Sequence, residues 1–318
     1  MDIDLDLYRH EIKISSNPLI RLSAIDVSPE SPQRTIVFIH GFGGKAEQWG
    51  YQMQKFAMDN RVIALDIRGH GLSDKPSTGY DMPRIQTDLE TALAQLKVST
   101  PFTLIGHSFG GAIVTEYALN HPDHIEKLIL IATAGEFKLA PFLKFALKLP
   151  STVLRLIGPF TKKWLHAPPH ALKEYYRDNM SQWVGWGKFE KLEVPTMVIR
   201  GHRDFVFDRP LFEKVAKSIP GAEDVDVRTS GHMVMLERRE AVDRAIASFL
   251  KGEVKKSWRD KSFIIPKTQR DDLKTQRVWL NEYQEGVPYT VDVPRIAVHQ
   301  LLRSSVRRFP NNTAVYFE

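Results

Sequence analysis

Ser108 is the residue of this 318-residue chain that is best placed for covalent chemistry. It lies in the sequence GHSFGG (106–111), directly after the apolar run Phe102–Gly106 and before an expected helix over Phe109–Asn120. A strand that turns into a helix through G-x-S-x-G is a nucleophile elbow, which holds the serine Oγ above the sheet. The flanking glycines allow neighbouring backbone to approach closely. We therefore predict that Ser108 is a nucleophile rather than an incidental serine in a glycine-rich turn.

A serine hydroxyl becomes an effective nucleophile only when a base accepts its proton. Of the eleven histidines, His232 follows the last expected strand and precedes a helix expected from about Glu237. A base in that loop can reach over the carboxyl edge of the sheet, so we predict His232 as the base. Three other histidines, His40, His70 and His107, lie in turns near the same edge, where we expect them to shape the pocket.

An acid must orient the imidazole of the base and stabilise its charged form. Asp204 follows the expected strand Pro195–Gly201 within a loop. Asp208 lies four residues later and close to Pro210, a position that suits a helix cap. We therefore predict Asp204 as the acid and keep Asp208 as the alternative.

A developing oxyanion needs two preorganised backbone N–H donors. The residue after the nucleophile, Phe109, should supply one of them. The sequence HGFGG (40–44) follows another expected strand, and its Phe42 should supply the second, although these glycines are also compatible with a simple tight turn. The residues expected to line the substrate pocket are Phe42, His107, Phe142, Phe145, Val206 and Met233.

Five short motifs follow one another along Ile36–Leu250. They are HGFGG, DIRGHGLSD (66–74), GHSFGG, RGHRD (200–204) and SGHMVMLE (230–237). Together they resemble the α/β-hydrolase superfamily, specifically its capped esterase and lipase-like members. The resemblance implies an eight-stranded sheet, a helical cap, the chain order serine, acid, histidine, and no metal or organic cofactor. Haloalkane dehalogenases and epoxide hydrolases of this superfamily carry aspartate at the elbow, so Ser108 argues against both activities.

Short apolar runs that alternate with amphipathic stretches predict an α/β fold with a mostly parallel, doubly wound sheet. Near-continuous apolar strands are typical of a sheet covered by helices on both faces. The expected strands are Tyr8–Ile14 and Leu19–Val27 at an antiparallel edge, then Thr35–His40, Arg61–Asp66, Phe102–Gly106, Lys127–Ala132, Pro195–Gly201 and Val225–Arg228. The expected helices are Met82–Lys97, Phe109–Asn120, Pro210–Ile219 and Glu237–Leu250.

The composition divides the chain into a core (1–135 and 192–251), a cap (136–191) and an extension (252–318). Within the cap, apolar residues recur at helical spacing over Phe142–Trp164. The cap also holds ten Lys/Arg against four Asp/Glu. This surplus fits solvated helix faces, or else a surface for the phosphates of an acyl-CoA or of an anionic lipid.

The extension shows a second resemblance, over about forty residues. The segments that carry it are Trp279–Leu280, Gly286–Pro288, Val293–Pro294, Leu301–Leu302, Arg308–Pro310 and Thr313–Val315. They look like the start of an acyl-adenylate-forming enzyme, such as a long-chain acyl-CoA ligase. That family's phosphate-binding loop is not in this sequence, so we do not expect adenylation by this chain. The resemblance implies an adenylate-forming partner domain missing from this chain, or the remnant of a fusion.

The composition is that of a globular protein, with 42% hydrophobic and 26% charged residues. The absence of cysteine excludes disulfides and thiolate metal sites. An acidic N-terminus and the lack of a long apolar run favour a cytoplasmic protein without a secretory signal or a transmembrane segment, and we expect no nucleic-acid partner.

The leading hypothesis is a carboxylesterase that acts on small-molecule esters with a hydrophobic acyl group. Alternatives with the same chemistry are an acyl-CoA thioesterase, a lipase and a carbon–carbon bond hydrolase. A non-catalytic ligand-binding protein on the same fold is an alternative of a different class. The acyl length, the leaving group and the oligomeric state are left open by the sequence.

Overall fold

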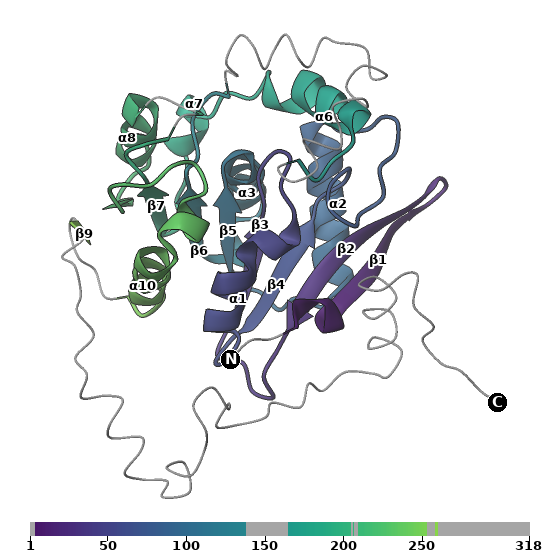
Figure 1. Cartoon of the computed structure of the whole chain (residues 1–318), viewed down its shortest axis with the longest axis horizontal. Coiled ribbons are helices and arrows are strands. Elements are labelled where there is room, and N and C mark those ends of the chain that lie inside the picture. The colour runs from purple at the N-terminus through teal and green to yellow at the C-terminus, as the bar shows by residue number, and fades with distance from the viewer. Residues whose placement is uncertain (1–3, 138–164, 205, 207–208, 253–257, 260–318) are drawn as a thin grey trace, which may run out of the picture.

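The computed structural model describes residues 4–137, 165–204, 206, 209–252 and 258–259. Its strands form one twisted sheet in the order β1-β2-β4-β3-β5-β6-β7-β8-β9 (Figure 1). Their bounds are β1 (Arg9–Ser16), β2 (Leu19–Val27), β3 (Thr35–Ile39), β4 (Arg61–Asp66), β5 (Phe102–His107), β6 (Ile125–Ile131), β7 (Thr196–Arg200), β8 (Glu223–Asp226) and β9 (Trp258–Arg259).

The pairing of the strands confirms the predicted mostly parallel sheet of eight strands, to which the two-residue β9 adds a ninth at one edge. β1 pairs antiparallel with β2, and β2 antiparallel with β4, as expected for the first two strands. All other neighbours are parallel. β8 begins two residues earlier than the expected Val225–Arg228, because it pairs with β7 from Glu223 to Asp226.

The strand order reverses at β3, which lies between β4 and β5. The chain leaves β3 in one direction to form β4 and then returns to form β5 on the other side of β3. Ile39 at the end of β3 pairs with Gly106 near the end of β5, so the loops that follow these two strands emerge side by side. Ligands of open α/β sheets bind at such switch points, outside the carboxyl ends of the strands.

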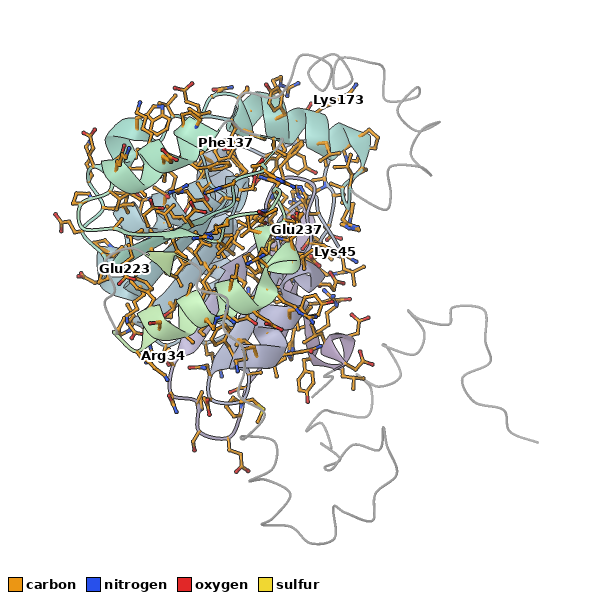
Figure 2. The ribbon with its side chains drawn as sticks, turned by 60° about the vertical axis from the view of Figure 1, so that its left-hand side comes forward. Arg34, Lys45, Phe137, Lys173, Glu223 and Glu237 are labelled. Atoms are coloured by element: carbon orange, nitrogen blue, oxygen red, sulfur yellow. The ribbon has the colours of Figure 1, made fainter. Side chains whose placement is uncertain are left out.

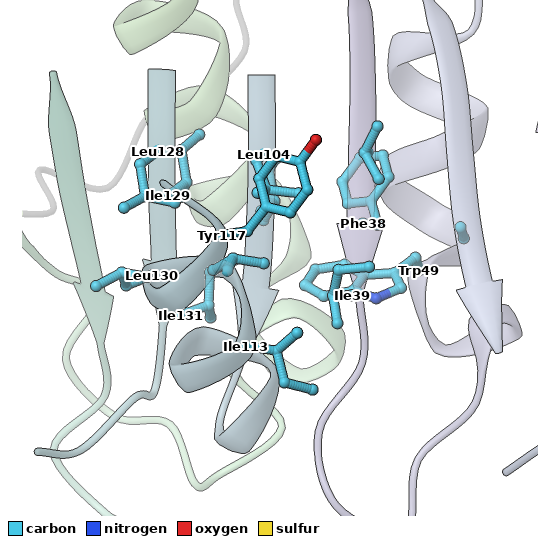
Figure 3. Close-up of a cluster of buried hydrophobic side chains, with 14 of the residues drawn as sticks. Phe38, Ile39, Trp49, Leu104, Ile113, Tyr117, Leu128, Ile129, Leu130 and Ile131 are labelled. Atoms are coloured by element: carbon cyan, nitrogen blue, oxygen red, sulfur yellow. The ribbon is translucent and has the colours of Figure 1, made fainter. Parts of the chain in front are cut away.

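Helices cover both faces of the sheet. α2 (Met82–Gln95) and α3 (Phe109–Asn120) contact each other on one face, and α1 (Gly50–Phe56) and α10 (Arg239–Leu250) contact each other on the other (Figure 1). The central strands are mostly apolar, as expected for strands that are buried on both faces in this way. Figure 3 shows this core, in which Ile113 and Tyr117 of α3 lie among side chains of β3, β5 and β6.

The expected helices are present with small shifts, except that the last one is interrupted. A short helix α9 (Val234–Glu237) precedes α10, and Arg238 between them has non-helical angles. The remaining elements are η1 (Leu5–Tyr8), η2 (Ala46–Trp49), η3 (Pro122–His124), α6 (Pro169–Tyr175), the π-helix η4 (Tyr176–Met180), α7 (Trp186–Phe189) and α8 (Arg209–Ser218). No helix in this part of the chain is long and apolar enough to cross a membrane.

The described part of the predicted cap contains α6, η4 and α7. α6 and α7 lie above the carboxyl ends of the parallel strands, on the same side as the loop after β3 (Figure 1). The apolar pattern over Phe142–Trp164 lies outside the described residues, and the division into core, cap and extension stays a prediction. β9 belongs to the segment that was expected to be an extension, and it pairs with β8.

Candidate active site

Ser108 lies at the junction of β5 and α3 in a strained backbone conformation. Its φ of 52° and ψ of −122° fall outside the regions that L-residues prefer, a strain that is concentrated at functional sites. A Cβ on Gly106 would lie 2.6 Å from the Gly110 carbonyl oxygen, and one on Gly110 would lie 2.5 Å from the Ile39 carbonyl oxygen. The chain can make this turn only with glycine at both positions, as the G-x-S-x-G context predicted.

His232 and Asp204 form a close pair on the neighbouring loops. His232 Nδ1 lies 2.6 Å from Asp204 Oδ2, and the Asp204 side chain is 2% exposed. The second carboxylate oxygen accepts the backbone N–H of Val206 at 2.7 Å. With Nδ1–H donating to the carboxylate, the basic nitrogen of His232 is Nε2. The predicted alternative, Asp208, lies outside the described residues.

His107 connects the Ser108 turn to the loop that contains His232. Its Nε2 lies 2.9 Å from the His232 carbonyl oxygen, which can only accept, so Nε2 carries the proton. Its Nδ1 faces the Gln48 side-chain amide at 3.5 Å, and the rings of His107 and His232 are 4.9 Å apart. Burial, and then the nearby His232, lower the pKa of His107 to about 3, so its imidazole is neutral. His107, which directly precedes Ser108, thereby anchors the backbone of His232.

Ser108 Oγ makes no hydrogen bond to His232 among the described residues. Catalytic hydrogen bonds are often long without substrate and shorten in the reactive complex. The structure thus connects the predicted base and acid, His232 and Asp204, to the Ser108 turn through His107, without a hydrogen bond between Ser108 and His232 among the described residues.

The two predicted oxyanion donors lie on adjacent loops. A Cβ on Gly41 would lie 2.9 Å from Ser108 Cβ, so the loop after β3 passes directly beside the nucleophile. Within the described part of the chain, neither the Phe42 N–H nor the Phe109 N–H donates to another protein group. Two unpaired donors beside a serine are what an oxyanion hole requires.

The residues predicted to line the pocket have different environments. Phe42 and Met233 are partly buried against the core, His107 is buried beside Ser108, and Val206 is 38% exposed. Phe142 and Phe145 lie outside the described residues, so the pocket as a whole stays a prediction.

Two residues near the site were missed by the sequence analysis. Tyr175 of α6 is fully buried, with its ring 6.1 Å from that of Phe42 and 5.5 Å from that of Phe109. Glu237 of α9, labelled in Figure 2, accepts the Gly231 N–H at 2.6 Å and so fixes the turn before His232. The motif SGHMVMLE contains Glu237, so its spacing from the base was the available signal. No such signal marks Tyr175, because its neighbours come from distant segments.

Buried neutral histidines should make the stability of the protein depend on pH. Burial lowers the pKa from 6.5 to about 4 for His40 and to about 3 for His70 and His107. Between these pKa values and 6.5 the unfolded chain binds more protons than the folded protein. The stability that the neutral buried imidazoles contribute is therefore complete above pH 6.5 and is lost as the pH falls towards 4. Each histidine should contribute about 2 kcal/mol to the loss between pH 7 and pH 5.

Urea unfolding of the parent and of His107→Gln at both pH values tests this expectation, because glutamine keeps hydrogen-bonding groups but does not titrate. The free energy of unfolding should fall less in the variant than in the parent, by about 2 kcal/mol. Substitution of the exposed His10 by glutamine is the control and should match the parent. An equal fall in His107→Gln and the parent would show that His107 is not buried in its neutral form.

No group of three or more His, Asp, Glu or Cys residues that could hold a metal ion occurs among the described residues.

A family model described as alpha/beta hydrolase fold matches residues 34–165, which include β3, the elbow and α3. This is a protein of the α/β-hydrolase fold. The solved structures that resemble this chain include an esterase from Exiguobacterium antarcticum, with 25% identity, a TM-score of 0.64, and coverage of 76% of this chain and 98% of that one. An enol-lactonase from Burkholderia xenovorans LB400 has 21% identity, a TM-score of 0.63, and coverage of 73% and 97%.

A curated relative of this chain is the putative 2-succinyl-6-hydroxy-2,4-cyclohexadiene-1-carboxylate synthase of Bacillus subtilis (strain 168). The two chains are 24% identical over an alignment of 272 positions, which covers 75% of this chain and 98% of the relative. These proteins are named for different reactions, so the likeness supports the fold and does not identify the substrate.

Proposed function

We propose that this α/β-hydrolase is a serine carboxylesterase that cleaves hydrophobic acyl esters through an acyl-enzyme on Ser108. The observation that carries the proposal is the 2.6 Å contact between His232 and Asp204, in a loop that His107 anchors to the elbow. This arrangement provides a base with a defined tautomer close to a strained serine, which a receptor on the same fold does not need.

In the proposed reaction, Ser108 Oγ attacks the acyl carbonyl carbon while His232 Nε2 accepts its proton. The carbonyl oxygen becomes an oxyanion and accepts hydrogen bonds from the Phe42 and Phe109 N–H groups. His232 then protonates the leaving alkoxide, and the alcohol departs from the acyl-enzyme. Water repeats the sequence and releases the acid and Ser108. Asp204 stays ionised throughout and stabilises the imidazolium.

The esterase among the structural neighbours supports an ester substrate, and the enol-lactonase supports a closely related bond. Thioesters, triacylglycerols and carbon–carbon bonds next to a carbonyl remain the alternatives, since the same triad can cleave each of them. The predicted acyl contacts Phe142 and Phe145 lie outside the described residues. The likeness of the C-terminal segment to an acyl-adenylate-forming enzyme also lies outside them and stays a prediction. A cytoplasmic location stays a prediction.

A hydrolysis panel tests the proposal. We expect the highest kcat/KM on p-nitrophenyl esters of graded chain length, lower values on the matched acyl-CoAs, and no effect of EDTA. A fluorophosphonate probe should label the protein stoichiometrically, with the added mass on the peptide that contains Ser108. Turnover of acyl-CoAs far above that of esters would replace the carboxylesterase with a thioesterase. The absence of both turnover and labelling would favour a non-catalytic protein.

A further inference from the structure

Two buried imidazoles join the loop after β3 to the loop after β4. His40, in the first loop, lies with Nδ1 2.8 Å from the Gly41 carbonyl oxygen, and its Nε2 accepts the Ile67 N–H at 3.1 Å. A carbonyl can only accept and a backbone N–H can only donate. These partners therefore require neutral His40 with its proton on Nδ1.

His70, in the second loop, makes the reciprocal connection. Its Nδ1 lies 3.0 Å from the Arg68 carbonyl oxygen, and its Nε2 accepts the Gly43 N–H at 3.1 Å. Each imidazole thus donates within its own loop and accepts from the other loop. The two rings are fully buried with centroids 5.1 Å apart. We call this pair, His40 and His70, the histidine cross-tie.

The cross-tie acts on the peptide unit that carries one oxyanion donor. The Gly41 C=O and the Phe42 N–H belong to the same planar trans peptide, so they point in opposite directions. The Gly41 oxygen is held by His40 Nδ1–H and also accepts the Gly44 N–H at 3.0 Å. Fixing the carbonyl end of this peptide therefore fixes the direction of the Phe42 N–H at its other end.

The residue after Phe42 is held as well. Gly43 has a φ of 74°, donates its N–H to His70, and accepts the His166 N–H at 2.8 Å. The backbone on both sides of Phe42 is therefore fixed, while the Phe42 N–H itself has no protein partner in the described part of the chain. Such preorganisation lets a donor stabilise developing charge without reorganising during the reaction.

We propose that His40 and His70 are positioning residues for the oxyanion hole, and that together they aim the Phe42 N–H at the substrate oxyanion. The inference rests on the proposed serine hydrolase function, because it assigns a role within that reaction. Neither imidazole takes part in proton transfer, since each has both ring nitrogens engaged with backbone groups. Their neutral state agrees with their burial, which lowers the pKa of both rings.

Paired substitutions separate positioning from packing. His40→Leu removes both hydrogen bonds, whereas His40→Asn keeps a donor close to the position of Nδ1. His70→Leu and His70→Gln form the second pair, in which glutamine keeps an acceptor close to the position of Nε2. We expect each leucine variant to lower kcat by about 10- to 100-fold, since loss of a whole oxyanion donor costs about 100- to 1,000-fold. KM should stay within about threefold of the parent, and the amide variants should recover most of kcat.

The kinetics are normalised to active sites counted by fluorophosphonate labelling, so that misfolded protein does not contribute. A trifluoromethyl ketone, which forms an oxyanion on the serine, should bind the leucine variants more weakly by the same factor as the loss in kcat/KM. The matching methyl ketone, a ground-state mimic, should bind all variants equally.

A parent-like kcat per labelled site in both leucine variants would overturn the positioning role of the histidine cross-tie. Equal losses of affinity for the trifluoromethyl and methyl ketones would also overturn it. Failure of the parent itself to hydrolyse esters or to react with the fluorophosphonate would instead overturn the proposed function. If one leucine variant does not fold, the other pair and both amide variants still decide the outcome.

Discussion

Replacement of Ser108 by alanine should lower kcat for ester hydrolysis by on the order of a million-fold. The hydroxyl is the group that forms the proposed acyl-enzyme, and no other side chain in the GHSFGG turn can replace it. The residual rate should still exceed that in water, because the oxyanion donors and the binding site remain.

The same substitution should leave the fold intact. Alanine keeps the Cβ, so it adds no new backbone strain at a φ of 52°. Ser108 Oγ has no hydrogen-bond partner among the described residues, so its removal leaves no buried group unpaired there. We expect the free energy of unfolding to stay within about 1 kcal/mol of the parent.

The matched control is Ser218→Ala, which removes a serine hydroxyl at the end of α8 that donates to the Lys214 carbonyl oxygen. It should hydrolyse the same ester at the parent rate. Hydrolysis by purified Ser108→Ala at close to the parent rate would show that Ser108 is not the nucleophile.

Replacement of His232 by alanine should be nearly as damaging as loss of the serine, because the hydroxyl then has no base. Asp204→Asn should be less damaging and should lower kcat by on the order of ten-thousand-fold. An asparagine amide in place of Oδ2 would donate to Nδ1 at the 2.6 Å contact and so favour the tautomer with its proton on Nε2. That tautomer cannot accept the serine proton.

Active-site titration and steady-state kinetics of His232→Ala, Asp204→Asn and Asp208→Asn test this order. Asp208→Asn should keep most of the activity, because Asp204 holds the direct contact to the imidazole. If Asp208→Asn abolishes hydrolysis and Asp204→Asn spares it, the acid has been assigned to the wrong residue. The double variant of His232 and Asp204 should be little worse than His232→Ala alone, since members of a triad act as a unit.

The polar edge of the sheet was harder to predict than its centre. β3, β5 and β6 are buried on both faces, so their apolar runs predict them directly. β8 begins with Glu223 and Asp224, and Arg200 of β7 pairs with Asp224 across the ladder. Charged residues that form ion pairs with a neighbouring strand do not extend an apolar run in the sequence, so the start of β8 was predicted two residues too late.

By itself, the sequence determined the strand-to-helix turn at Ser108 and the central strands, and it predicted the order of serine, acid and base. These features depend on local patterns, namely glycines around a serine and apolar runs bounded by turns. The elements that hold the site in place come from segments far apart in the chain.

Tertiary structure alone decided how those segments meet. The order β4-β3-β5 places the loop with Gly41 beside Ser108 and beside the turn with His70. The reciprocal hydrogen bonds of His40 and His70, and the contact of His107 with the backbone of His232, depend on that order. A single sequence contains the histidines but not the identity of their distant partners, because burial and strand pairing bring the Nε2 atom of each ring to a backbone group far away in the chain.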